Sequence, residues 1–175
     1  APKAPVAAKK PFLVKAPFGA TREDEYYWLR DDTRKNPEML AYLAAENAYA
    51  DSRLKSLEPL EKALFDETVS RIKQDDSTVP YMKNGYYYYT RFETGADYPI
   101  VARRKGAMTG PEEILFDEPV MAKGKGFFQI AEWQVSPDGT KIAWAEDVVG
   151  RRQYSMKVKE IATGAVLADS VANIE

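Results

Sequence analysis

Two places in this 175-residue sequence carry side chains that could act in catalysis. Asp31 and Asp32 are adjacent carboxylates, and Ser136 lies two positions before Asp138. A serine nucleophile needs a base that takes its proton near neutral pH, and that base is usually histidine. The sequence contains no histidine and no cysteine. Ser-His-Asp and Cys-His catalysis, His/Cys zinc sites, thiol redox chemistry and disulfides are therefore excluded for this chain by itself.

Both places are interpreted as structural. Two carboxylates that hydrolyse a glycoside are held across a cleft, whereas sequence neighbours point apart. Asp31 and Asp32 are therefore expected to bind backbone amides before a helix, or to pair with Arg30 or Arg34. The segment Ser136-Pro137-Asp138-Gly139 is typical of a turn, because each of its residue types favours one. We expect no catalytic residue, no cofactor and no metal ligand in this chain.

The charged residues are numerous but balanced, with 25 basic and 27 acidic side chains. No whole-molecule field attracts nucleic acid or an anionic membrane, so neither is expected as a partner. The clusters Arg103-Arg104-Lys105 and Arg151-Arg152 are expected to be solvated, although contact with an acidic partner surface remains open. No apolar run approaches the ~20 residues that span a bilayer, so the chain is expected to be soluble. A cytoplasmic and a periplasmic location both remain possible.

The first part of the chain is predicted to contain a flexible tail and two helices. Residues 1–11 are rich in Ala, Pro and Lys and poor in large apolar groups, so they are assigned to the tail. Residues 12–77 form an extension in which Asn36 caps one helix, with Pro37 in its first turn, and a second helix begins near Pro59. Both helices carry an apolar stripe that is expected to pack into a core. The stripes contain Leu40, Leu43, Ala50, Leu54 and Leu57, and then Leu60, Leu64, Phe65, Val69 and Ile72.

From Val79 onward the apolar period changes from helical to strand-like. Two sets of short strands, separated by turns that contain glycine, repeat after about 50 residues, which indicates four-stranded propeller blades. The predicted fold is mainly β with N-terminal helices, ending in one to two antiparallel four-stranded blades of an incomplete β-propeller. Blade 1 covers about 78–120 and blade 2 about 127–175 of a partial propeller at 78–175. The predicted strands are Tyr86 to Glu93, Tyr98 to Lys105, Glu113 to Asp117, Gln129 to Val135, Lys141 to Asp147, Tyr154 to Ile161 and Ala165 to Asp169.

The run of four tyrosines from Tyr86 to Tyr89 supports this interpretation. Successive side chains of a strand point to opposite faces of the sheet, so the run indicates that both faces meet protein. The same alternation places Arg103 and Arg104 on opposite faces of their strand. Stacking of the tyrosines on nucleic-acid bases is disfavoured, because no basic groove accompanies them.

Four segments of the chain are informative in combination. They are DEYYWLRDD at 24–32, YYYTRFETGADYPI at 87–100, SPDG at 136–139 and DVVGRRQY at 147–154. The SPDG turn motif is common in propellers, but its combination with the other three is specific. Together the segments resemble the N-terminal part of the prolyl oligopeptidase family of serine peptidases, and its oligopeptidase B branch in particular. They follow the order and spacing of that family from roughly Phe12 to Glu175.

The resemblance implies a two-domain serine peptidase. Members have an extension that reaches the catalytic domain, a seven-bladed propeller that restricts access to short peptides, and a C-terminal α/β-hydrolase domain with Ser, Asp and His. The oligopeptidase B branch cleaves after Arg or Lys. This chain has no Gly-x-Ser-x-Gly motif, so it is expected to be a truncated, inactive portion of the parent. The expected partners are the parent's α/β-hydrolase domain and, for the parent, short basic peptides.

Tyr26, Trp28 and Arg30 in the extension are candidates for the interface with the catalytic domain. Two blades cannot close a ring, so open propeller edges are expected to promote self-association. A propeller-type interaction module with no attached hydrolase is the alternative, because propellers host many unrelated functions.

Overall fold

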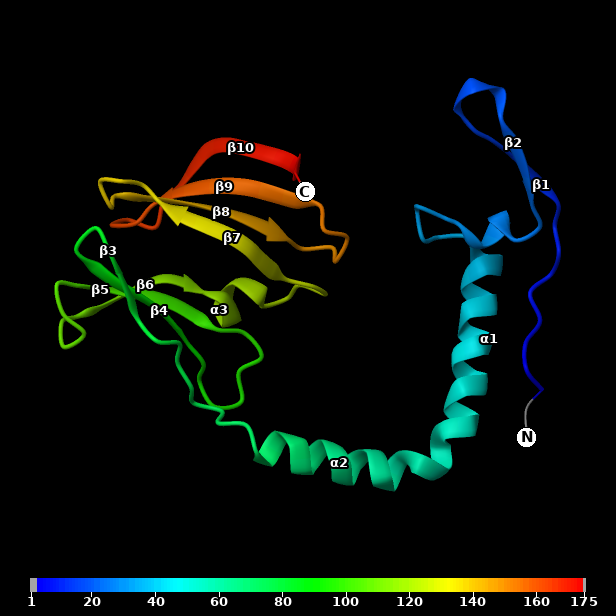
Figure 1. Cartoon of the computed structure of the whole chain (residues 1–175), viewed down its shortest axis with the longest axis horizontal. Helices are drawn as coiled ribbons and strands as arrows, with labels where there is room; N and C mark the ends of the chain where they lie inside the picture. Colours follow the sequence, from blue (N-terminus) through cyan, green and yellow to red (C-terminus); the bar gives the residue numbers. More distant parts are fainter. Residues whose placement is uncertain (1–2, 175) are drawn as a thin grey trace. The chain divides into compact units, whose positions relative to one another are not determined.

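The computed structural model describes residues 3–174, and contacts divide the chain into two compact units, one ending at Arg71 and one beginning at Ile72 (Figure 1). Residues 1, 2 and 175, the ends of the predicted tail and of the predicted second blade, lie outside the described residues. Each unit is described by itself.

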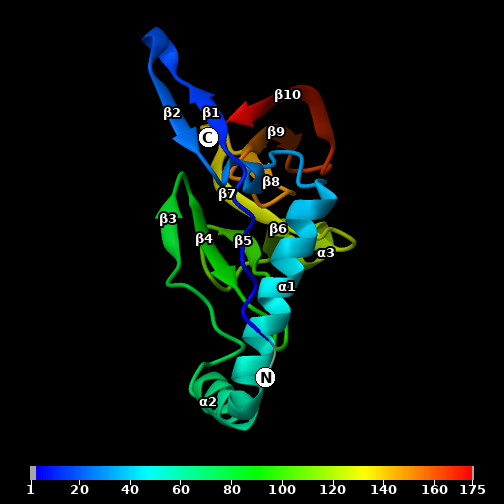
Figure 2. The ribbon, with the colours of Figure 1, turned by 90° about the vertical axis from the view of Figure 1, so that its right-hand side faces the viewer.

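The first unit opens with a two-stranded antiparallel hairpin of β1 (Phe12–Lys15) and β2 (Thr21–Asp24), seen in Figure 2 as a narrow ribbon. A short helical turn, η1 (Pro17–Gly19), joins the strands and leaves the Phe18 side chain fully exposed with a positive φ of 66°. The 3-10 turn η2 (Tyr27–Leu29) follows. The sequence did not predict the hairpin, because Thr-Arg-Glu-Asp in β2 has no apolar alternation.

Two helices follow where the sequence predicts them. Helix α1 (Pro37–Leu54) starts at Asn36, whose side-chain oxygen accepts hydrogen bonds from the amides of Glu38 at 3.0 Å and Met39 at 3.3 Å. The 3-10 turn η3 (Lys55–Leu57) joins it to helix α2 (Glu58–Ser70). The predicted cap and both helices are confirmed. Among residues 3–174, no helix combines the length and apolarity needed to cross a bilayer.

The predicted packing of the two apolar stripes is wrong for the described residues. Met39 is the buried residue of α1, while Leu43 is 46% exposed and Phe65 on α2 is 66% exposed. Each helix contacts the η3 turn that joins them, and most side chains of the two stripes are exposed. Helical periodicity identifies an apolar face but not the surface that covers it. The other exposed members are Leu40, Ala50, Leu54, Leu57, Leu60, Leu64 and Ile72.

The end of the predicted flexible tail has specific partners in the structure. The backbone amide of Lys10 donates a hydrogen bond to the carbonyl of Glu25 at 2.8 Å. The Lys9 ammonium lies 2.7 Å from the Glu25 carboxylate. The carbonyl of Ala8 accepts a hydrogen bond from Nε1 of Trp28 at 2.8 Å. These contacts bring residues 8–10 into the first unit.

The second unit contains two antiparallel sheets of four strands, and the strands of each sheet follow chain order (Figure 1). This arrangement confirms the predicted blades. The short helix α3 (Glu118–Ala122) lies between the two sheets in sequence, and neither α3 nor the three-residue strand β3 was predicted. The first sheet contains β3 (Tyr81–Lys83), β4 (Tyr86–Arg91), β5 (Ile100–Lys105) and β6 (Glu112–Asp117), and the second contains β7 (Gln129–Val135), β8 (Lys141–Asp147), β9 (Tyr154–Glu160) and β10 (Val166–Ile174).

One hydrophobic core joins the two sheets. Phe116 of β6 lies at its centre, with its ring centroid 5.5 Å from that of Trp144 on β8. Both sheets bury large side chains there, so each supplies the apolar surface that the other needs. The buried members are Tyr88, Val101, Leu115 and Phe116 from the first sheet, and Val135, Ile142 and Trp144 from the second.

Candidate functional site

The serine and the carboxylate of the 136–139 segment form a turn, as predicted. Ser136 Oγ donates a hydrogen bond to Asp138 Oδ1 at 2.6 Å, and the amide of Thr140 donates to the same oxygen at 3.0 Å. These donors stabilise the charged carboxylate and lower the pKa of Asp138 to about 2. Gly139 has a φ of 74°, which favours glycine at this position. The hydroxyl therefore serves the turn, with no imidazole in the chain to activate it.

Asp31 organises the segment before α1, also as predicted. Its carboxylate accepts hydrogen bonds from the Thr33 hydroxyl at 2.7 Å and from the amides of Lys35 and Asn36, each at 2.7 Å. The Thr33 hydroxyl and these amides hold the pKa of Asp31 well below its usual range. Asp32 is exposed and lies 3.6 Å from the Arg30 guanidinium. The two adjacent carboxylates therefore do not converge on a reacting group.

The three residues proposed for a domain interface have different surroundings. Trp28 packs within the first unit, edge-on to Tyr42 with ring centroids 5.9 Å apart and with the Lys10 ammonium 5.0 Å from its ring. Tyr26 is 41% exposed. The Arg30 side chain is 66% exposed and its ion pair with Asp32 is weak because both partners are solvated. Tyr26 and Arg30 are therefore the members with free surface in this structure.

The prediction that the cluster Arg103-Arg104-Lys105 is solvated is wrong for Arg103. Arg103 is 2% exposed, and its guanidinium lies 4.0 Å from the Tyr86 ring. Its Nε donates to Glu113 at 2.6 Å, and its Nη2 donates to the carbonyl of Gly139 at 2.9 Å. The reason is that this face of β5 is covered by the second sheet. Arg151 and Arg152 are exposed, as expected.

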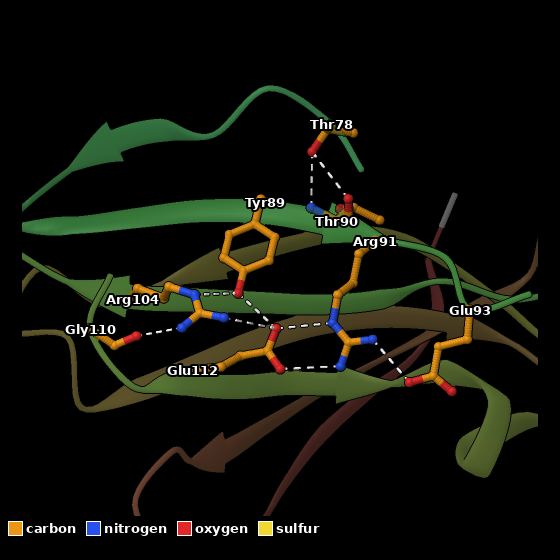
Figure 3. A network of polar contacts seen from close by, with 8 residues as sticks. All are labelled: Thr78, Tyr89, Thr90, Arg91, Glu93, Arg104, Gly110 and Glu112. Atoms are coloured by element: carbon orange, nitrogen blue, oxygen red, sulfur yellow. Dashed lines mark hydrogen bonds and ion pairs between the residues drawn. The ribbon is translucent and has the colours of Figure 1, made fainter. Parts of the chain in front are cut away.

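A network of polar side chains involves strands β4, β5 and β6 of the first sheet (Figure 3). Glu112 accepts hydrogen bonds from Arg91 Nε at 2.9 Å and from the Tyr89 hydroxyl at 2.7 Å. Arg104 Nε donates to the Tyr89 hydroxyl at 2.8 Å. Hydrogen bonds from Arg91, and also from Tyr89, lower the pKa of Glu112. Arg91 also pairs with Glu93 at 2.9 Å, so two arginines balance two glutamates and the network stabilises the sheet.

This network also explains the run of four tyrosines. Tyr88 is 3% exposed and belongs to the core between the sheets, whereas Tyr89 is 6% exposed and is covered by Arg104 and Glu112 of its own sheet. The Tyr88 face of β4 therefore packs against the second sheet, as predicted, whereas the Tyr89 face is covered by side chains of its own sheet. The sequence did not predict the network, because its members come from three strands and meet only when the register is fixed.

Two four-stranded antiparallel sheets, each meandering in chain order and packed face to face, are typical of neighbouring blades in a β-propeller protein. Among residues 3–174, no group of acidic side chains is arranged to hold a metal ion. Residues 5–175 match the family model described as prolyl oligopeptidase, N-terminal β-propeller domain. The chain belongs to this family.

Known relatives agree with this assignment. The chain is 49% identical over 187 aligned residues to dipeptidyl aminopeptidase BI of Pseudoxanthomonas mexicana, with 98% of this chain and 26% of that protein covered. It is 29% identical to protease 2 of Moraxella lacunata, with 98% of this chain and 25% of that protein covered. The chain thus spans about a quarter of the length of these relatives.

Solved structures give the same result for the fold. Oligopeptidase B from Leishmania major superimposes with a TM-score of 0.85 at 30% identity, over 97% of this chain and 26% of that one. Oligopeptidase B from Trypanosoma brucei, in a closed form with covalently bound antipain, gives a TM-score of 0.83 at 29% identity, over 97% of this chain and 26% of that one.

Proposed function

We propose that this chain is the non-catalytic N-terminal portion of a serine peptidase of the prolyl oligopeptidase family. The observation that carries the proposal is the family match over residues 5–175 in a chain that contains no histidine. A Ser-Asp-His triad needs an imidazole as its general base. The triad therefore has to come from another part of the parent protein, in an α/β-hydrolase domain.

The chain's role in that peptidase is to restrict access and to hold the catalytic domain. The blades contribute to a propeller that admits short peptides, and movement of the propeller against the catalytic domain gates their passage. The exposed apolar faces of α1 and α2 support a contact with further protein, because such continuous apolar surface favours burial. Tyr26 and Arg30 offer additional exposed surface in the first unit.

Two substrate preferences are proposed for the parent. The first is cleavage after Arg or Lys, which the structural likeness to two oligopeptidase B enzymes supports. The second is release of dipeptides from a free amino terminus. The 49% identity to a dipeptidyl aminopeptidase supports this preference, and it is higher than the 29% identity to protease 2. The two preferences differ in whether a blocked amino terminus is tolerated.

The purified 175-residue chain is expected to leave Arg- and Lys-linked chromogenic peptides uncleaved, because it lacks the base of the triad. The full-length parent is expected to cleave them. Initial rates are measured with the amino terminus of each peptide either free or acylated. Cleavage of the acylated peptide supports the first preference, whereas cleavage restricted to free dipeptidyl substrates supports the second.

The control is the parent with its nucleophilic serine replaced by alanine, purified in the same way. Activity of the 175-residue chain that survives repurification and exceeds this control would contradict the proposed non-catalytic role. A parent that cleaves neither class of peptide would contradict the proposed peptidase.

Self-association of the isolated chain remains a prediction. Exposed apolar side chains on α1 and α2, together with the outer faces of two sheets, favour contact between copies. Light scattering at micromolar concentration is expected to give a mass above the 19.7 kDa of one chain. A single monodisperse monomer across a tenfold range of concentration is the contrary result.

A further inference from the structure

Two cationic side chains cross the seam between the two sheets in opposite directions. Arg103 of β5, in the first sheet, donates from Nη2 to the carbonyl of Gly139 in the β7–β8 turn at 2.9 Å. Lys159 of β9, in the second sheet, donates from Nζ to the carbonyl of Leu115 in β6. Each sheet therefore supplies one cation and one backbone acceptor to the other.

Both acceptors are carbonyls at places where the regular strand ladder is interrupted. Gly139 lies in the turn, outside the paired strands β7 and β8. Leu115 lies at a register shift, because Val101 pairs with Phe116 whereas the next residue, Ala102, pairs with Ile114. A β-bulge leaves its extra residue without a partner across the ladder. The two irregularities thus provide acceptors for donors from the opposite sheet.

Aromatic rings lie close to both cations. Lys159 Nζ lies 4.6 Å from the Phe116 ring centroid and 5.8 Å from that of Trp144. The Arg103 guanidinium lies 4.0 Å from the Tyr86 ring. Lys159 is half-buried, and this burial lowers the pKa of its ammonium. Cation–π attraction and hydrogen bonding replace part of the lost hydration.

These contacts differ in kind from the apolar core. Burial of apolar surface is non-directional and tolerates sliding, whereas a hydrogen bond fixes the positions of donor and acceptor. Separation of the sheets also leaves a buried carbonyl and a cation without partners, which is unfavourable unless water reaches them at once. The seam therefore resists small displacements that a purely apolar interface accepts.

We propose that Arg103 and Lys159 act as a reciprocal clasp that makes the two sheets a single cooperative unit. The sheets open together rather than one at a time. Movements of a propeller that contains these blades then occur at other seams, while this pair of blades moves as one body.

Native-state hydrogen exchange of the 175-residue chain, read by mass spectrometry in low urea, tests the clasp. The amides of β4 and β5 report on the first sheet, and those of β8 and β9 on the second. In the unmodified chain the amides of the two sheets are expected to show the same protection and the same dependence on urea, because one cooperative unit opens as a whole. Independent opening of the sheets in the unmodified chain would overturn the proposal.

The test variant combines Arg103→Met and Lys159→Met, which keep the unbranched stems and remove the donors. Glu113 loses its partner Arg103 in this variant, but its side chain is 40% exposed, so water can solvate the carboxylate. Protection of the two sheets is expected to separate by on the order of tenfold, the effect of losing hydrogen bonds to buried carbonyls. Unchanged joint exchange in this variant would refute the clasp.

The matched control combines Arg104→Met and Lys157→Met, on the same two strands. Arg104 binds Tyr89 and Gly110 within the first sheet, and Lys157 binds Glu146 within the second at 2.6 Å. This variant is expected to lose stability while both sheets still exchange together; separation of the sheets here would also refute the proposal. If the clasp variant does not fold, Lys159→Met alone is measured, and a partial separation is expected from it. Joint exchange in that single variant counts against the clasp.

Discussion

Replacing Phe116 by alanine is expected to lower the free energy of unfolding of the second unit by about 3–5 kcal/mol. Phe116 is 1% exposed, and its ring lies 5.5 Å from Trp144 and 6.5 Å from Trp133, measured between ring centroids. Alanine leaves a cavity between the sheets that close-packed neighbours fill only in part. Urea unfolding followed by tryptophan fluorescence measures the loss, because two of the three tryptophans adjoin the site.

Phe18→Ala is the matched control. The Phe18 side chain is fully exposed at the β1–β2 hairpin, so its removal is expected to change stability by no more than about 0.5 kcal/mol. Equal effects of Phe116→Ala and Phe18→Ala would contradict the placement of the core between the two sheets.

Glu118→Gln is expected to remove a pH dependence of stability between about pH 4.5 and pH 7. Glu118 of α3 is 8% exposed, and burial raises the pKa of its carboxyl from 4.5 to about 7. The folded state therefore keeps a proton that the unfolded chain loses in this window. Stability is highest below the unfolded pKa, falls as pH rises through the window, and stays low above the folded pKa. The expected fall is about 3 kcal/mol.

Urea unfolding at a series of pH values from 4.5 to 8 measures this effect. The neutral amide of glutamine keeps the shape of the side chain without the charge, so Glu118→Gln is expected to exceed the unmodified chain in stability at pH 8. Glu132→Gln, at an exposed position of β7, is the matched control and is expected to leave the pH slope intact. Glu112 and Asp138 do not interfere, because their lowered pKa values place their contributions at more acidic pH. An unchanged slope in Glu118→Gln would contradict the assignment.

Much of the fold follows from local patterns in the sequence. Asn36 followed by Pro37 marks the start of α1, and Ser-Pro-Asp-Gly marks the β7–β8 turn, because each depends on residues within one turn of the chain. Strand β3 was missed since three residues are too few for a period. Helix α3 was missed for a similar reason, as its five residues span little more than one turn.

The contacts that characterise the second unit were beyond sequence reasoning. Strand alternation correctly places Arg103 and Arg104 on opposite faces, but it does not predict that Arg103 binds Gly139 of the second sheet while Arg104 binds Tyr89 of the first. The carbonyl of Leu115 is available as an acceptor because of a register shift, and no residue type in the sequence predicts that shift. The apolar stripes of α1 and α2 follow from helical periodicity, but periodicity does not predict what covers them. A sequence pattern therefore predicts where a helix or strand lies, whereas tertiary packing determines which elements it contacts.

The chain-ordered pairing of the strands has a consequence for synthesis. In both four-stranded sheets each strand is hydrogen-bonded to strands adjacent in sequence, so neither sheet needs a distant segment of the chain in order to form. Such local topology favours rapid folding, and domains fold progressively as the chain leaves the ribosome. The first sheet has all its strands once Asp117 has emerged, and its apolar face is then the surface on which residues 129–174 assemble. Lys159 reaches back 44 residues to Leu115, so this contact between the sheets cannot form until β9 has been synthesised.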